Sequence, residues 1–230
     1  MEPEQPHPDP EPGPAHGRLS ARPVLAPADT GPVGTVPVEP ADTAAAVYVP
    51  PGGDAPRRLV VALHGAGGTA EQSLRILRPV ADAANLLVLA PKSSGRTWDV
   101  ITGGYGPDVV RIDRAVAAVS ARYRVRPDTY AIAGFSDGAS YALSLGVTNG
   151  DLVDTVLAFS PGFLAPLLRV GRPRVFVSHG TADRVLPIDR CGRRVVAGLR
   201  RDGYPVTYEE FDGGHEIPDD ILDRAVDWLG

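Results

Sequence analysis

Short apolar runs alternate with segments of helical spacing along most of the chain. Runs typical of buried strands include RLVVAL, LLVLA, TVLAF and RVFVS. Between them, apolar residues recur every three or four positions, as they do on the buried side of an amphipathic helix. Strands that alternate with helices favour an α/β fold, with a mainly parallel central sheet and helices on both faces.

The boundaries of the predicted elements follow from this pattern. Strands are expected at residues 33–38, 44–49, 58–63, 86–90, 130–133, 155–159, 174–178 and 206–211. Helices are expected at residues 71–84, 109–123, 137–147, 189–201 and 219–229. Pro79 lies inside the first helix, where proline kinks or splits a helix. No repeat and no second folded domain is evident.

The first 32 residues differ from the rest in composition. Proline recurs every two or three positions, and aromatic residues are absent. Such a segment buries too little apolar area to offset its ordering entropy, so we predict a disordered or polyproline-II tail. We therefore divide the chain into a tail at 1–32 and one domain at 33–230. Two alternatives stay open: contact of parts of 18–32 with the domain, and a proline-rich docking peptide.

The sequence GFSDG, Gly134 to Gly138, follows an apolar run and precedes an alanine-rich helical segment. Strand, sharp turn and helix around G-x-S-x-G are typical of a nucleophile elbow. The glycines leave room where strand and helix nearly touch, and Ser136 stands at the apex. The turn aims the amide of Asp137 toward a developing oxyanion. The alternative is an ordinary glycine-rich turn.

An acid and a base follow in the loops after later strands. HGTADRVLP contains Asp183, and DGGHEIP contains His215. The chain order Ser136, Asp183, His215 is the order of α/β-hydrolases and separates them from two other serine-triad folds. Asp189 and Asp212 are the alternative acids.

Other candidate side chains are assigned structural roles. His64 and His179 each precede a glycine at a strand end and are expected to order turns by hydrogen bonds. Ser160 ends a strand without the preceding glycine, so at most it lines the site. Cys191 is expected to face a helix interior. No metal or cofactor is expected, because no His, Cys and Asp cluster has metal-ligand spacing.

Four motifs, LHGAGG, GFSDG, HGTADRVLP and DGGHEIP, are spread over nearly the whole domain. With them the chain resembles the carboxylesterase/phospholipase branch of the α/β-hydrolase superfamily, which includes dienelactone-hydrolase-like and acyl-protein-thioesterase-like enzymes. In this branch glutamine often follows the nucleophile, whereas Asp137 stands here. A carboxylate at this point is expected to alter the pH profile or to disfavour anionic substrates.

The resemblance implies a serine carboxylesterase that acts on a small-molecule ester. His215 takes the proton of Ser136 during attack, and Asp183 orients the imidazole. The amides of Ala66 and Asp137 receive the oxyanion. An acyl-enzyme forms, and water releases it.

The substrate pocket is harder to predict. The link SPGFLAPLLRVGR leaves no room for a large cap domain. An open site suits short to medium acyl chains. Trp98 and Tyr105, on the long polar loop at 91–108, are expected to wall the pocket, although packing is the alternative for Trp98. Gly67 and Leu186 complete the predicted substrate-binding residues.

Charge and cysteine content narrow the remaining choices. The net charge of −5 gives no reason to expect nucleic acid or an anionic membrane surface. The sequence has no 18-residue apolar span, and its acidic, proline-rich start does not read as a secretory signal. A single cysteine fits a reducing compartment. We therefore expect a cytoplasmic protein and leave its oligomeric state open.

Three other functions remain possible at this point. A thioesterase or a small peptidase would use the same triad. A non-catalytic binding protein would keep the fold without turnover. Under a third interpretation, the proline-rich tail is the functional part of the protein and the domain is its scaffold.

Overall fold

The computed structural model describes residues 12–26, 28–52 and 55–230. Its strands are β1 (Gly34–Pro37), β2 (Ala45–Val49), β3 (Arg58–Leu63), β4 (Leu86–Pro91), β5 (Tyr130–Phe135), β6 (Val153–Phe159), β7 (Arg174–Gly180) and β8 (Val206–Phe211). Its helices are α1 (Ala70–Ala81), α2 (Asp99–Thr102), α3 (Pro107–Arg122), α4 (Asp137–Thr148), α5 (Gly192–Arg201) and α6 (Asp219–Leu229), with 3₁₀ turns η1 (Pro14–His16) and η2 (Ala41–Thr43).

The strands form one sheet in the order β1-β2-β4-β3-β5-β6-β7-β8. β2 pairs antiparallel with β1 and β4, and every pair from β4 to β8 is parallel. The carboxyl ends of β5, β7 and β8 therefore meet at one edge, where ligands bind in open α/β sheets. The predicted α/β architecture is confirmed.

Most elements differ by a few residues from their predicted limits; α1, for example, ends at Ala81 and not at residue 84. The loop predicted at 91–108 contains the short helix α2, and α5 begins at Gly192 because residues 188–191 form a turn. Pro79 does not split α1, which continues two residues beyond it. Thr69 and Gln72 start α1 with a capping box, in which each side chain accepts the backbone amide of the other.

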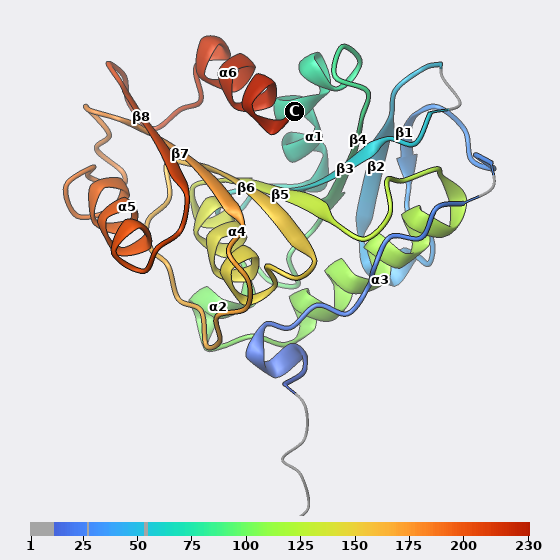
Figure 1. Cartoon of the computed structure of the whole chain (residues 1–230), viewed down its shortest axis with the longest axis horizontal. Coiled ribbons are helices and arrows are strands. Elements are labelled where there is room, and N and C mark those ends of the chain that lie inside the picture. Colours follow the sequence, from blue (N-terminus) through green and yellow to red (C-terminus); the bar gives the residue numbers. More distant parts are fainter. Residues whose placement is uncertain (1–11, 27, 53–54) are drawn as a thin grey trace, which may run out of the picture.

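Helices cover both faces of the sheet, and each face has its own hydrophobic cluster (Figure 1). α1 and α6 lie on one face, called the α1/α6 face below. α2, α3, α4 and α5 lie on the other, called the α3/α4 face. The cluster on the α3/α4 face is the larger, and it includes Trp98, Tyr105 and Tyr141.

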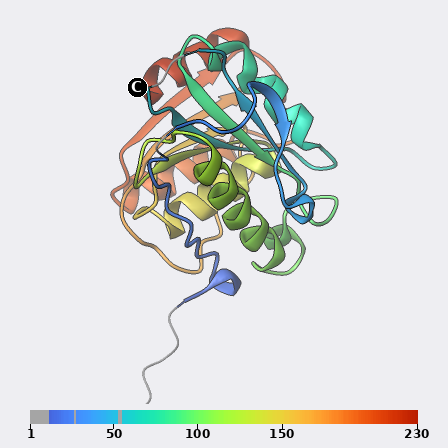
Figure 2. The same cartoon turned by 90° about the vertical axis from the view of Figure 1, so that its right-hand side faces the viewer.

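Residues 17–26 and 28–32 pack on the α3/α4 face, alongside α3 (Figures 1 and 2). We call these residues the N-terminal strap. Leu19 is 3% exposed within the cluster of this face. Further along the strap, the amide of Thr30 donates to the carbonyl of Arg122.

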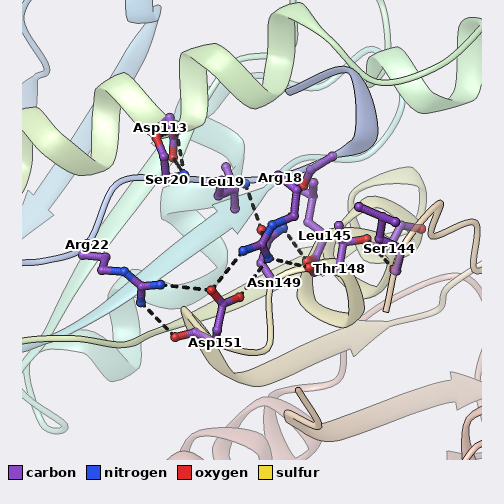
Figure 3. Close-up of polar contacts among 12 residues, drawn as sticks. Arg18, Leu19, Ser20, Arg22, Asp113, Ser144, Leu145, Thr148, Asn149 and Asp151 are labelled. Atoms are coloured by element: carbon purple, nitrogen blue, oxygen red, sulfur yellow. Dashed lines mark hydrogen bonds and ion pairs between the residues drawn. The ribbon is translucent and has the colours of Figure 1, made fainter. Parts of the chain in front are cut away.

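Arg18 anchors the strap beyond the end of α4 (Figure 3). Its guanidinium donates to the Thr148 carbonyl over 2.7 Å, to Asn149 Oδ1 over 3.0 Å, and to both carboxylate oxygens of Asp151. Ser20 donates its amide to the Asp113 carboxylate on α3.

The predicted domain boundary at residue 33 is therefore wrong for the strap. The proline content of this segment suggested too little burial, whereas Arg18 and Leu19 supply an ion pair and an apolar anchor. Residues 1–11, also predicted as tail, lie outside the described residues.

A row of hydroxyls on α4 holds the link between β6 and β7. Ser140 Oγ accepts the amides of Gly162 and Phe163, and Ser144 Oγ accepts the amide of Ala165. One turn further on, Thr148 Oγ1 donates to the Leu168 carbonyl. The link is thus fastened to α4, and residues 160–173 contain no helix or strand. This agrees with the expected absence of a large cap.

Candidate active site

Ser136 lies in the tight turn between β5 and α4. Its φ is 58° and its ψ is −121°, a strained backbone conformation for a residue with a side chain. The turn is held by the Ser136 amide, which donates to the Phe159 carbonyl over 2.9 Å. A Cβ at Gly134 would overlap the Gly138 carbonyl, and a Cβ at Gly138 would overlap the Leu63 carbonyl. The glycines are therefore required by the close approach of β5, α4 and the end of β3.

Three side chains from separate loops form one hydrogen-bonded line. His215 Nε2 lies 2.9 Å from Ser136 Oγ. His215 Nδ1 lies 2.7 Å from Asp183 Oδ2. Ser136 follows β5, Asp183 follows β7 and His215 follows β8. The structure thus brings together the serine, acid and histidine that the sequence singled out, in the arrangement of a nucleophile, its base and an orienting carboxylate.

The Asp183 carboxylate is buried and fully engaged. Its Oδ1 accepts the amides of Val185 and Leu186 over 2.9 and 2.8 Å. Burial opposes ionisation, but these amides and His215 outweigh it, so the pKa of Asp183 lies below its ordinary value. The carboxylate therefore stays ionised and holds the imidazole. The alternative acid Asp189 instead pairs with Arg193 at the surface.

His179 supports the Asp183 turn from behind. Its Nε2 lies 2.7 Å from the Leu186 carbonyl and 3.3 Å from Asp183 Oδ2. Burial lowers its pKa, so the ring is neutral and donates from Nε2 to the carbonyl. A Cβ at Gly192 would press against the ring, which explains glycine at the start of α5. The predicted turn-ordering role of His179 is confirmed.

His64 orders the loop after β3 in the same way. Its Nδ1 lies 2.7 Å from the Gly65 carbonyl, and its Nε2 accepts the amide of Ser93 over 3.1 Å. Burial lowers the pKa of this histidine as well. The predicted structural role is confirmed, and His64 takes no place in the hydrogen-bonded line at Ser136.

The loop after β3 lies against the elbow. A Cβ built at Gly65 would stand 3.4 Å from the Cβ of Ser136. The amide of Gly67 donates to the Arg96 carbonyl. The backbone amides of Ala66 and Asp137 have no hydrogen-bond acceptor among the residues that the structure describes. Both predicted oxyanion donors are therefore available to an incoming oxygen.

Asp137, the unusual residue after the nucleophile, is held by the long loop. Its Oδ2 accepts the Thr97 hydroxyl over 2.7 Å. The carboxylate is half-buried and fixed beside the elbow. Such a negative charge favours neutral or cationic groups near the oxyanion loop over anionic ones.

Two predicted substrate contacts are wrong. Trp98 is 0% exposed, donates Nε1 to the His64 carbonyl over 2.8 Å and stacks on Tyr141. Tyr105 is buried in the same cluster, with its hydroxyl donating to the Ala165 carbonyl. Neither ring can form the wall of an open pocket, because both are packed within the hydrophobic cluster of the α3/α4 face. Gly67 and Leu186 lie in loops beside the elbow and Asp183, so a role in substrate binding stays a prediction for them.

A groove of about 620 Å³ opens beside His215, between α1 and α6. We call it the α1/α6 groove. Its apolar lining residues are Ile76, Pro79, Val80, Phe135, Ile217 and Leu222. Sequence reasoning did not single out this site. One feature of the sequence could have indicated it. Ile76 and Val80 are apolar residues one turn apart on α1, and they lie outside the row of buried residues that faces the sheet.

Within residues 12–26, 28–52 and 55–230, no group of three or more His, Cys, Asp and Glu side chains is arranged to hold a metal ion. In the same ranges, none of the helices combines the length and apolar character that a membrane crossing needs.

Comparison with known proteins rests on structure. No protein-family profile and no curated protein sequence matches the chain. Esterase PE8 superposes with a TM-score of 0.65 at 24% identity, over 79% of this chain and 95% of its own. A Bacillus cereus carboxylesterase gives 0.62 at 16% identity, over 80% and 92%. The fluorophosphonate-binding serine hydrolase FphF of Staphylococcus aureus gives 0.66 at 16% identity, over 80% and 91%.

These structures share the layered sheet over most of both chains. At such identities the likeness establishes the fold, and function has to be argued from the site. The chain therefore has the α/β-hydrolase fold.

Proposed function

We propose that this protein is a serine hydrolase that cleaves carboxylic esters through an acyl-enzyme. The observation that carries the proposal is the line from Asp183 through His215 to Ser136, with distances of 2.7 and 2.9 Å. The strained turn that presents Ser136 and the unpaired amides of Ala66 and Asp137 support it. The esterases and the serine hydrolase among the structural neighbours fit the same chemistry.

The acylation half-reaction follows from these positions. His215 Nε2 takes the proton of Ser136 as Oγ bonds to the ester carbonyl carbon. The carbonyl oxygen becomes an oxyanion and accepts the amides of Ala66 and Asp137, each worth roughly 3 kcal/mol of barrier in serine hydrolases. The carbon–oxygen bond to the alcohol then breaks, and the imidazolium gives its proton to the leaving oxygen.

Deacylation repeats these steps with water as the nucleophile. His215 takes a proton from water, whose oxygen attacks the acyl carbon. Ser136 leaves with that proton, and a carboxylic acid is released. Asp183 stabilises the imidazolium in both half-reactions.

Short to medium acyl chains are the proposed substrates. The link after β6 is fastened to α4, and residues 160–173 contain no helix or strand that could form a cap over Ser136. Activity toward p-nitrophenyl esters should peak at the short or medium members of the series. A maximum at long chains would contradict this preference without touching the triad.

Fluorophosphonate labelling read by intact mass tests the nucleophile. Wild type should gain one adduct, and Ser136→Ala should gain none. Ser160→Ala is the matched control, because Ser160 also ends a strand with a positive φ of 51°, and it should label like the wild type. An unlabelled wild type, or an adduct on Ser136→Ala, would refute the proposal and favour a non-catalytic binding protein or another nucleophile.

A further inference from the structure

The α1/α6 groove touches the candidate site from one side only. Its lining includes His215 and Phe135, which directly precedes the nucleophile. The two rings pack with centroids 4.7 Å apart. No residue of the oxyanion loop at 65–68 lines the groove. The groove therefore adjoins the base of the triad and not the oxyanion donors.

The position of the α1/α6 groove beside His215 determines which half of an ester can enter the groove. During acylation, His215 Nε2 must give its proton to the leaving oxygen, which requires that oxygen within hydrogen-bond reach of Nε2. The oxyanion points away, toward the amides of Ala66 and Asp137. The group attached to the leaving oxygen is thus the one directed past the imidazole, where the groove begins.

We infer that the α1/α6 groove binds the alcohol half of the ester and selects apolar alcohols that carry no negative charge. This inference rests on the proposed function and adds its substrate class. The groove is about 620 Å³ in volume, and small-molecule sites usually measure 300–1,000 Å³. It has room for an alkyl or aryl alcohol several carbons long.

The walls of the groove match such an alcohol. Its apolar lining comes from Ile76 and Val80 on α1, from Ile217 before α6 and Leu222 within it, and from Phe135 at the end of β5. Burying an alkyl chain against these side chains is favourable because it removes apolar surface from water.

The rim of the groove is acidic. Glu216, Asp219 and Asp223 line it, against one cation, Arg75, which lies 3.9 Å from Glu71. An alcohol with a carboxylate or phosphate would meet net negative charge, whereas a neutral or cationic alcohol would not.

Pro79 offers a test that does not threaten folding. It is exposed on the groove wall, inside α1, where proline lacks the backbone donor of an ordinary helical residue. Pro79→Trp fills the groove. Arg78→Trp is the matched control, because it adds the same indole ring at the neighbouring exposed position of α1, which does not line the groove.

Two substrate series separate the alcohol from the acyl half. Alkyl acetates from ethyl to hexyl vary only the alcohol and share one acetyl-enzyme. p-Nitrophenyl esters from acetate to octanoate vary only the acyl chain. Pro79→Trp should lower kcat/KM for hexyl acetate relative to ethyl acetate by about tenfold, while Arg78→Trp leaves that ratio unchanged. Across the p-nitrophenyl series, Pro79→Trp should lower every member by the same factor.

The outcomes distinguish this inference from the proposed function. If Pro79→Trp changes the acyl-length preference, or leaves both series unchanged, the groove assignment is overturned while ester hydrolysis stands. If wild type hydrolyses neither series and takes no fluorophosphonate, the proposed function fails, and this inference fails with it.

The acidic rim is tested by charge reversal. Asp223→Lys should raise kcat/KM for an ester of an anionic alcohol, such as the acetate of a hydroxy acid, several-fold relative to butyl acetate. Asp227→Lys is the matched control, because Asp227 lies one turn further along α6 and does not line the groove. Equal effects of the two variants would overturn the charge selection.

Discussion

The two faces of the sheet are covered to different degrees. The α3/α4 face is covered by α2, α3, α4, α5 and the N-terminal strap, and its hydrophobic cluster includes Trp98 and Tyr105. The α1/α6 face has two helices, with a groove of about 620 Å³ between them. Ser136, Asp183 and His215 stand at the edge where the two faces meet.

The comparison shows how one layered fold provides both rigidity and access. On the α3/α4 face, aromatic packing and the fastened link hold the elbow from behind. On the α1/α6 face, α1 and α6, which lie far apart in the sequence, leave a groove beside His215.

The largest effect, a loss of kcat, is expected at the edge of the sheet where Ser136, Asp183 and His215 meet. Asp183→Asn should lower kcat by about 10⁴-fold, because an amide in place of the carboxylate favours the wrong tautomer of His215. Steady-state kinetics measure this, and thermal melting checks that the fold is kept. Asp189→Asn, in the same connection but exposed, should keep full activity. A loss of less than tenfold in Asp183→Asn would mean that Asp183 does not orient the base.

The second prediction contrasts the two faces by stability. Trp98→Ala should reduce the free energy of unfolding by about 3–5 kcal/mol, through a cavity in the α3/α4 face and the lost bond to the His64 carbonyl. Val80→Ala, on the half-buried groove wall, should cost less than about 1 kcal/mol. Urea denaturation followed by circular dichroism measures both. Comparable losses would show that the α1/α6 face is as tightly packed as the other.

The third prediction concerns the strap. Arg18→Ala should destabilise the fold by about 2 kcal/mol, because it removes partly buried bonds to Thr148, Asn149 and Asp151. Arg22→Ala is the matched control: Arg22 also pairs with Asp151, but its side chain is 52% exposed, against 21% for Arg18. It should cost less than about 0.5 kcal/mol. Equal shifts in Tm would mean that the strap is a surface attachment.

The smallest expected effect is a pH dependence of the same anchor. Hydrogen bonding to Arg18 lowers the pKa of Asp151 to about 2. In the unfolded chain the pKa of an aspartate lies near 3.9. Because the pKa of Asp151 is lower in the folded state, its ionised carboxylate stabilises the fold at pH values above about 3.9, and this stabilisation is lost as the pH falls toward 2. The difference in Tm between wild type and Asp151→Asn should therefore be constant at neutral pH and shrink between about pH 4 and pH 2. A difference that does not change with pH would exclude Asp151 as the titrating group.

Local rules made the elbow and the triad predictable from sequence. Gly134 is required by its contact with Gly138 in the same turn, and Gly138 by the close approach of the end of β3. Parallel strands bring their carboxyl ends together whatever their distance in the chain. The same topology placed Asp183 and His215 beside Ser136 without any knowledge of packing.

The errors arose where side-chain position depends on distant partners. Trp98 sits in a polar loop, and only its stacking on Tyr141 of α4 shows that it is buried. Leu19 lies among prolines, and its burial depends on α3 and α4. The groove depends on the gap between α1 and α6, which no local pattern encodes.

The hydroxyl row on α4 has a consequence for how substrate is presented. Enzymes that digest aggregated lipid commonly carry a roof that swings aside when it meets the oil–water boundary. In this protein the corresponding link, residues 160–173, is hydrogen-bonded to Ser140, Ser144 and Thr148 of α4, so it cannot act as a hinged lid. Under the proposed function, turnover of a sparingly soluble ester should level off at the solubility limit, without the jump in rate that emulsion droplets give a lidded lipase.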